Sequence, residues 1–319
     1  MERQPKTLME AVRYFADADR TLATMVELRW PDGVHCPTCG RTDVRFIATR
    51  RLWECKEKHP RKQFSAKVGT IFEDSPLPLD KWFVAVWSIA NCKNGISSYE
   101  LGRAIGVTQK SAWHMLHRIR IAMELGSLDK FDRTTEADET YVGGLAKNMH
   151  AKKREAVVSG TGGVDKAAVV GLLERGDADN ASRIRAHMII DANAKTLQRV
   201  VRENVNAGSM LITDGWSAYN GLAKDYVHQS VDHKGEFVRG IVHTNRIENF
   251  WSLLKRGLKG TYVSVEPVHL GRYIGEQVFR FNKRKDNDAG RFRKVISSVA
   301  GKRLTYKDLI GHATSQAAA

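Results

Sequence analysis

The sequence has no apolar run long enough to cross a membrane. A membrane-spanning helix needs roughly 18 consecutive apolar residues, and no run in this 319-residue chain approaches that length. The first residues, MERQPKTLMEAVRYF, also lack the continuous apolar core of a secretion signal. A hydrophobic fraction of 42% is nevertheless too high for a chain that is disordered throughout. We therefore expect folded domains in the cytoplasm and no membrane partner.

Acidic residues are in the minority. The chain holds 36 Asp and Glu against 51 Lys and Arg, a formal net charge of +15. Two stretches concentrate the surplus: residues 51–67, and residues 239–303 with 15 Lys and Arg against 5 Asp and Glu. Such a surplus favours a polyanionic partner, most simply nucleic acid. A merely basic protein without such a partner remains the alternative.

Glycine-rich phosphate-binding motifs are missing as well. No GxGxxG or GxxxxGK[ST] follows a strand pattern, and the nearest stretch, residues 160–163, lacks the following Lys-Ser/Thr. Residues 133–233 instead show three strand patterns, a helix and two further strands, which is not the strict alternation of a Rossmann domain. We expect a mixed α/β sheet of five strands with helices. Helical patterns precede it at residues 7–30 and 78–126 and follow it from residue 243.

Cysteine is scarce, and three of the four cysteines are clustered. Cys36 and Cys39 form a CxxC on a tight turn, and Cys55-Lys-Glu-Lys-His59 follows after fifteen intervening residues. Three thiolates and one imidazole at this spacing can close a tetrahedral, structural Zn²⁺ site. His35, beside Cys36, is the competitor of His59 as the fourth ligand. A redox CxxC is disfavoured because no thioredoxin-like pattern surrounds it.

Residues 96–120, ISSYELGRAIGVTQKSAWHMLHRIR, show two helix patterns around a glycine turn. Ser97 and Thr108 can each cap one of these helices. This arrangement predicts a helix-turn-helix whose second helix enters a DNA major groove, although an ordinary helical hairpin gives a similar pattern. The side chains expected at the start of that helix are Gln109, Lys110 and His114.

Three acids lie in contexts that can bring them together. Asp138 lies in the strand pattern TTEADETYVGG, and Asp214 ends the apolar run SMLIT. Glu248 lies on the helix pattern HTNRIENFWSLLKRGLKG. Mg²⁺ takes oxygen ligands such as carboxylates, and two such ions can drive an in-line displacement at a phosphate. We expect these three residues to hold the metal.

The helix that carries Glu248 has two distinct faces. Its apolar stripe consists of Ile247, Phe250, Trp251, Leu254 and Leu258. Glu248, Lys255 and Lys259 share another face, so an acid for the metal and a lysine for a phosphate are presented together. We expect Lys255 to act in catalysis. The residues of this helix expected to contact DNA are Arg246, Arg256 and Lys259.

Other titratable residues compete for these roles. Glu136 shares the strand face of Asp138, whereas Glu139 points to the opposite face. Asp191 ends the third strand pattern, and Glu276 lies on the last long helix. Histidines 243 and 269 can assist catalysis or bind phosphate, or they can be structural.

Taken together, these segments resemble bacterial insertion-sequence DDE transposases with an N-terminal zinc ribbon. The resemblance covers about residues 20–285. The segments that carry it are LRWPDGVHCPTCG, RKQFSAKVGTIFEDSPLPLDKW, ISSYELGRAIGVTQKSAWHMLHRIR, DETYVGG, TDGWSAY, HTNRIENFWSLLKRGLKGTY and HLGRYIGEQVFRFNKRK. It implies an RNase H-like catalytic domain and carries the family's acidic triad onto Asp138, Asp214 and Glu248. The basic partner of the third acid falls on Lys255. The family often has a second CxxC where this chain has Cys55-x3-His59.

The resemblance also implies an activity and partners. It implies Mg²⁺- or Mn²⁺-dependent cleavage of double-stranded DNA at terminal inverted repeats, and joining of the 3′ ends to target DNA. It implies a homo-oligomer on paired DNA ends in the bacterial nucleoid. A DNA-binding regulator without catalysis and an RNase H-like, structure-specific nuclease are the alternatives. The expected domains are a helical segment (1–30), the zinc ribbon (31–76), the helix-turn-helix domain (77–128), the catalytic domain (133–285) and a basic C-terminal tail (286–319).

Overall fold

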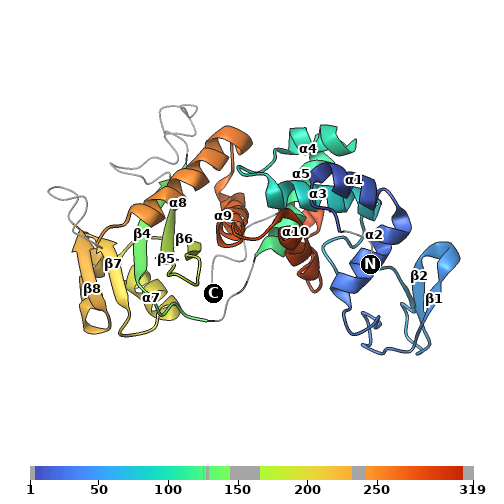
Figure 1. Cartoon of the computed structure of the whole chain (residues 1–319), viewed down its shortest axis with the longest axis horizontal. Coiled ribbons are helices and arrows are strands. Elements are labelled where there is room, and N and C mark those ends of the chain that lie inside the picture. Colours follow the sequence, from blue (N-terminus) through green and yellow to red (C-terminus); the bar gives the residue numbers. More distant parts are fainter. Residues whose placement is uncertain (1–3, 125, 127–128, 144–165, 232–241, 312–319) are drawn as a thin grey trace. The chain divides into compact units, whose positions relative to one another are not determined.

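The computed structural model describes residues 4–124, 126, 129–143, 166–231 and 242–311 (Figure 1). The chain divides into two compact units. We call Met1–Glu124 with Asp286–Ala319 the helical unit, and Leu125–Lys285 the sheet unit. Within the described residues, no helix has the length and apolar character that crossing a bilayer requires.

The helical unit begins with two helices, although the periodicity of residues 7–30 predicted one. Helix α1 spans Leu8–Phe15 and starts at a capping box formed by Thr7 and Glu10. Helix α2 spans Ala18–Arg29. The Asp17 side chain accepts hydrogen bonds from the main-chain N–H groups of the two residues that follow Ala18, so a new helix starts there.

A three-stranded antiparallel sheet follows α2. Its elements are β1 (Val44–Ile47), the short 3₁₀ helix η1 (Ala48–Arg50), β2 (Leu52–Cys55) and β3 (Gln63–Phe64). The ring of Trp53 on β2 stacks on Phe64 and meets Trp30 edge-on. These aromatic contacts anchor the small sheet to the end of α2.

Five further helices complete the helical unit. They are α3 (Leu79–Asn91), α4 (Ser98–Ile105), α5 (Gln109–Met123), α10 (Asp288–Ser297) and α11 (Tyr306–Ile310). Gly106 joins α4 to α5 with a φ of 64°, a left-handed conformation that glycine adopts without strain. The two helices and their turn have the expected helix-turn-helix order.

Residues 286–311, which we expected to belong to a basic tail, contribute to the core of the helical unit. Helix α10 packs against α3. The buried Phe292 ring on α10 lies 5.1 to 5.5 Å from the rings of Phe15, Phe83 and Trp87. The buried residues of α10, which are Phe292, Val295 and Ile296, are spaced among its basic residues. Residues 312–319 of the predicted tail lie outside the described residues.

The sheet unit is built on five strands. They are β4 (Thr135–Val142), β5 (Ala167–Glu174), β6 (Arg183–Ile189), β7 (Met210–Asp214) and β8 (Val227–Val231). Their order is β6-β5-β4-β7-β8. The first three strands are antiparallel, and β7 and β8 run parallel to β4. This mixed five-stranded sheet with helices confirms the predicted RNase H-like fold.

Helices cover both faces of this sheet, as Figure 1 shows for α7 and α8. The other elements are α7 (Ala194–Asn204), the 3₁₀ segment η3 (Ser217–Lys224), α8 (Asn245–Arg256), the π-helical turn η4 (Gly257–Tyr262) and α9 (Pro267–Asn282). One core joins α7 and η3 to the sheet, and a second joins α8 and α9 to the other face. Along β5, Val170 and Leu172 belong to the first core, and Val169 and Leu173 to the second. The two faces of the sheet therefore present different sites.

Candidate active site and metal centre

The three acids of the predicted triad lie on neighbouring elements of the sheet unit. Strand β4 runs parallel to β7, with Glu136 opposite Ile212. Two residues further along both strands, Asp138 comes level with Asp214 at the end of β7. Glu248 lies in the first turn of α8, which packs on β4.

The environment of Asp138 reflects this convergence. Burial raises the pKa of Asp138 to about 6, and the negative charges of Asp214 and Glu248 add to this rise. The Trp251 indole N–H opposes it by donating to Asp138 Oδ2 at 2.9 Å. Carboxylates that repel one another in this way are stabilised by a shared cation. The donor set, three carboxylates, therefore fits Mg²⁺ or Mn²⁺.

Glu248 is exposed, but a buried neighbour orients it. The Thr244 hydroxyl donates to Glu248 Oε1 at 2.8 Å from the position before α8 begins. Within the described residues, the ligand oxygens of the three acids do not all lie within 4.8 Å of one another, unlike the atoms of the cysteine cluster below. The three carboxylates are thus spaced more widely than the ligand atoms of the cysteine cluster.

Glu136, the alternative to Asp138 on the same strand face, has a different role. Its carboxylate is fully buried and forms an ion pair with Arg175, with 2.7 Å between Oε1 and Nε. Oε2 accepts hydrogen bonds from the main-chain N–H groups of Arg246 and Ile247. Because both oxygens are engaged, Glu136 is not placed as a metal ligand.

Glu139 points to the opposite face of β4, as predicted. Tyr219 on η3 donates to Glu139 Oε1 at 2.5 Å. Burial raises the pKa of Glu139 to about 8, and the charges of Asp138 and Asp214 add to this rise. Burial therefore favours the protonated form of Glu139, beside the triad.

The remaining competitors lie in local networks. Asp191 accepts a hydrogen bond from the Thr196 hydroxyl at the start of α7. Glu276 is buried on α9, where it accepts from Tyr262 and pairs with Arg280. These contacts account for both carboxylates without a metal.

The predicted basic residues lie along α8 and beyond it. Arg246 and Arg256 are exposed on α8, and Lys259 is exposed on η4. Lys255 is half-buried, two turns after Glu248 on α8. The structure therefore gives this helix one acidic and several basic groups that solvent can reach.

Histidines 243 and 269 each have a protein partner. Arg175 contacts His243 through both the ring Nδ1 and the main-chain oxygen. His269 Nδ1 lies 3.3 Å from the guanidinium of Arg272. These contacts give both histidines a structural environment.

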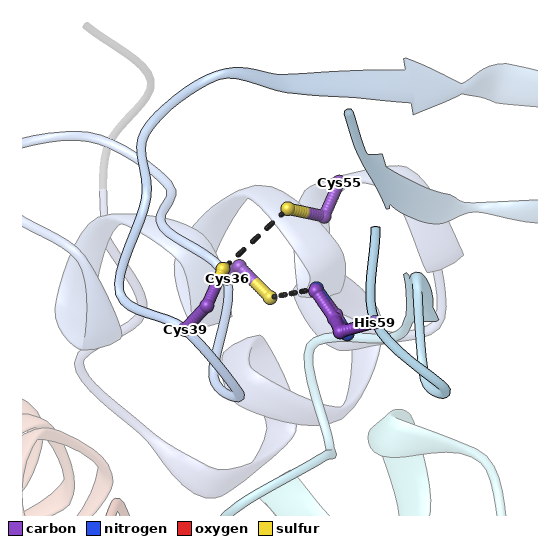
Figure 2. Close-up of side chains that lie close together, drawn as sticks. All are labelled: Cys36, Cys39, Cys55 and His59. Carbon is purple, nitrogen blue, oxygen red and sulfur yellow. Dashed lines mark hydrogen bonds between the residues drawn. The ribbon is translucent and has the colours of Figure 1, made fainter. Parts of the chain in front are cut away.

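The cysteine cluster forms in the helical unit, as Figure 2 shows. Cys36 Sγ lies 3.4 Å from His59 Nε2, and Cys39 Sγ lies 3.6 Å from Cys55 Sγ. All four ligand atoms lie within 4.8 Å of one another. A tetrahedron with Zn–S bonds of about 2.3 Å has edges of roughly 3.8 Å, so these spacings fit zinc.

The structure also separates the two candidate histidines. His59 belongs to the cluster, whereas the His35 ring packs edge-on against Trp30. Burial opposes ionisation of Cys36, but hydrogen bonds from the N–H groups of Cys39 and Thr38 outweigh it and lower its pKa. A thiolate, the form that binds zinc, is therefore favoured at Cys36.

The predicted DNA contacts of the helix-turn-helix lie in the first turns of α5. Gln109 Nε2 donates to Ser98 Oγ, which ties α5 to α4. The Lys110 ammonium lies 4.7 Å from the centre of the Tyr306 ring. His114 Nε2 lies 3.2 Å from the main-chain oxygen of Leu304. The segment around α11 thus contacts this end of α5.

Sequence reasoning missed three residues of the site. Trp251 counted only as part of an apolar stripe, although its indole N–H binds Asp138. Arg175 lies outside every quoted motif, and Thr244 lies in the pattern HTNRIENFWSLLKRGLKG without being singled out. The available signal for Trp251 was its indole N–H, since a buried tryptophan needs a hydrogen-bond acceptor.

Comparisons with known proteins agree with this geometry. The model of the ISXO2-like transposase domain matches residues 131–282, and the model of the transposase zinc-ribbon domain matches residues 17–59. The chain is 28% identical over 265 residues to an uncharacterized protein in transposable element ISH50 of Halobacterium salinarum. That match covers 78% of this chain and 86% of the relative. No solved structure matches the chain significantly.

Proposed function

We propose that this chain, which carries an ISXO2-like DDE transposase domain behind an N-terminal transposase zinc ribbon, cleaves and joins DNA ends. The substrate would be the terminal inverted repeats of its own insertion sequence, and the products would be 3′ ends joined to target DNA. The convergence of Asp138, Asp214 and Glu248 on the face of the sheet that α8 covers supports this proposal, because the charges of Asp214 and Glu248 contribute to the raised pKa of Asp138.

Each residue of the site would have its own role. Asp138, Asp214 and Glu248 would bind Mg²⁺ or Mn²⁺, and Trp251 would hold the Asp138 carboxylate in place. When bound, the metal supplies activation of water or of a 3′-hydroxyl and neutralises charge on the phosphate. Lys255 would bind a phosphate of the DNA end from the same helix as Glu248.

The other parts of the chain would bring DNA to this site. Zn²⁺ held by Cys36, Cys39, Cys55 and His59 would stabilise the basic ribbon. The ribbon and the helix-turn-helix, through Gln109, Lys110 and His114, would read the repeat. Arg246, Arg256 and Lys259 would contact backbone phosphates near the acids. Two or more copies would act together on paired ends.

A single assay tests the activity. Full-length protein is incubated with Mn²⁺ or Mg²⁺, a labelled DNA end taken from the inverted repeats flanking the gene, and a plasmid target. We expect wild-type protein to cleave and join the end, and D214N to lose both by roughly 1,000-fold or more, the scale on which catalytic groups matter. D191N, which removes a carboxylate charge at the end of the third strand pattern, is the matched control and should keep activity.

The outcomes separate the alternatives. Cleavage by D214N at the wild-type rate would overturn the mechanism. Cleavage without joining, and without preference for the repeat, would identify a nuclease. Specific binding of the repeat without either reaction would identify a regulator.

A further inference from the structure

Glu136 lies two residues before Asp138 on the same face of β4, and its contacts lead to α8. Oε2 accepts from the main-chain N–H groups of Arg246 at 3.1 Å and Ile247 at 2.9 Å. These groups belong to the first turn of α8, where N–H groups have no partner within the helix. A buried carboxylate therefore closes the N-terminus of α8 and is stabilised by the positive end of the helix.

Arg175 extends this contact to the residue that leads into α8. Its Nε pairs with Glu136 Oε1 at 2.7 Å, while Nη2 donates to the main-chain oxygen of His243 at 2.6 Å. The guanidinium side chain is only 10% exposed. Arg175 thus connects Glu136 on β4, the central strand of the sheet, to the chain segment that precedes α8. The planar guanidinium suits this role because it offers several N–H donors at once.

Strand β4 consequently holds α8 at two points. Glu136 holds Ile247 through its N–H, and Asp138 holds Trp251 through its indole N–H. Glu248 lies between these two points in the sequence of α8. Its carboxylate is oriented by Thr244, which lies next to His243. A shift or rotation of α8 along the sheet would therefore move Glu248 relative to Asp138.

We propose that Glu136 is a positioning residue that, together with Arg175, places α8 and the Glu248 carboxylate for metal binding. This inference rests on the proposed function, because it assigns to the triad a metal that Glu136 itself does not touch. It predicts that the charge of Glu136 matters for metal affinity as well as for stability. Partners of this kind typically change metal affinity by 10- to 100-fold when removed.

The experiment measures metal binding directly as well as activity. Mn²⁺ affinity of the full-length protein is determined by calorimetric titration of zinc-loaded protein, and the Mn²⁺ concentration for half-maximal cleavage is measured in parallel. For E136Q, we expect the dissociation constant for Mn²⁺ and the half-maximal Mn²⁺ concentration both to rise by roughly tenfold or more. The side-chain amide keeps the size of the carboxylate but lacks the charge that faces Arg175 and the helix end.

E174Q is the matched control, because Glu174 is also a fully buried glutamate of the same sheet. It pairs with Arg133 and Arg183 and accepts main-chain N–H groups, but its hydrogen bonds lie away from α8. We expect E174Q to lower the melting temperature as E136Q does, while leaving Mn²⁺ affinity unchanged. Equal losses of Mn²⁺ affinity in both variants, or none in E136Q, would overturn the proposal.

A second pair of variants keeps the test decisive if E136Q does not fold. T244V removes the hydroxyl that orients Glu248, whereas T244S retains it. We expect T244V to weaken Mn²⁺ binding and T244S to restore it to near the wild-type value. If T244V and T244S bind Mn²⁺ alike, the inferred positioning chain from Glu136 to Glu248 is wrong.

The wild type and D214N show which of the two proposals fails. Absence of Mn²⁺ binding by wild-type protein, or its persistence in D214N, counts against the triad as a metal site. Binding that D214N abolishes and E136Q leaves intact counts against the positioning role alone.

Discussion

Glu136 and Glu174 are both fully buried, yet each is satisfied by different neighbours. Glu136 is shared between one arginine and the start of a helix, whereas Glu174 is shared between Arg133 and Arg183. A buried carboxylate without such partners would be protonated instead, as the raised pKa of Glu139 illustrates. At the scale of single residues, the neighbouring side chains and N–H groups decide whether a buried carboxylate stays charged, and which part of the structure it holds in place.

The pairing of Glu174 makes stability depend on pH in the acid range. Burial raises its pKa, but the hydrogen bonds from Arg183 and Arg133 outweigh burial and lower it to about 2. A lowered folded-state pKa contributes stability above the ordinary value of 4.5, and this contribution is lost as the pH falls toward 2. We expect E174Q to be less stable than wild type at pH 6, with the difference shrinking below pH 4.5.

Urea unfolding of wild-type protein and E174Q between pH 6 and pH 2.5 measures this difference. A difference in unfolding free energy that stays constant over the whole range would contradict the assignment.

Gly171 leaves room for the tryptophan that holds Asp138. It lies opposite Asp138 on β5, and an added Cβ would come within 2.6 Å of the Trp251 ring. We expect G171A to lose about 1–3 kcal/mol of stability through overpacking. It should also lower the cleavage rate, because the displaced indole no longer donates to Asp138.

Chemical denaturation and the cleavage assay check both effects. G271A on α9 is the control, since its nearest contact is the Met188 sulfur at an ordinary 3.6 Å. There, alanine should be neutral or stabilising by up to about 1 kcal/mol, as expected within a helix. A G171A protein as stable and active as wild type would be the contrary result.

At the scale of elements, the ribbon depends on its four ligands more than on its strands. Its strands have four, four and two residues, too few for a stable sheet without further support. The cluster connects the turn at Cys36 to the end of β2 at Cys55 and to His59. Metal binding and folding of this segment should therefore be coupled.

We expect purified protein to contain about one zinc ion per chain, and C55A to contain none. C92A is the matched control, because Cys92 follows α3 and lies outside the cluster. Elemental analysis of the three proteins gives the answer. Wild-type protein without zinc, or C92A with equal loss, would be incompatible with the ribbon as described.

The sequence predicted those features whose residues lie close together in the chain and are of a suitable chemical type. The position of Asp214 at the end of a strand was predictable because an apolar run leads directly into it. The spacing of Cys36, Cys39 and Cys55 predicted one metal cluster, but it left His59 and His35 as alternatives for the fourth ligand. The choice between Glu136 and Asp138 was not predictable. Both lie on one strand face, and only the folded chain shows that Arg175 and the start of α8 engage Glu136.

At the scale of the whole molecule, the sheet unit lies within the sequence of the helical unit. The chain leaves the helical unit after Glu124 and returns to it at Asp286. Phe292 then packs among rings that precede it by some 200 residues or more, including Phe83 and Phe15. No local pattern could show this, because the amphipathic spacing of α10 gives no information about its partner.

This connectivity predicts which fragments fold. Residues 1–124 alone would leave Phe15, Phe83 and Trp87 without Phe292, so we expect no cooperative thermal unfolding. The same residues joined by a flexible linker to residues 286–319 should unfold cooperatively. Near-ultraviolet circular dichroism during heating distinguishes the two proteins. Equal transitions in both would show that α10 is dispensable for this core.

The same connectivity fixes an order of events during synthesis. Residues 125–285 must leave the ribosome before α10 exists, which takes roughly ten seconds or more at about 5–20 residues per second. Throughout that interval the aromatic rings of α1 and α3 stay uncovered by α10. A stop codon before Asp288 therefore yields a chain whose helical unit lacks α10. We expect such truncated chains to be removed by proteolysis.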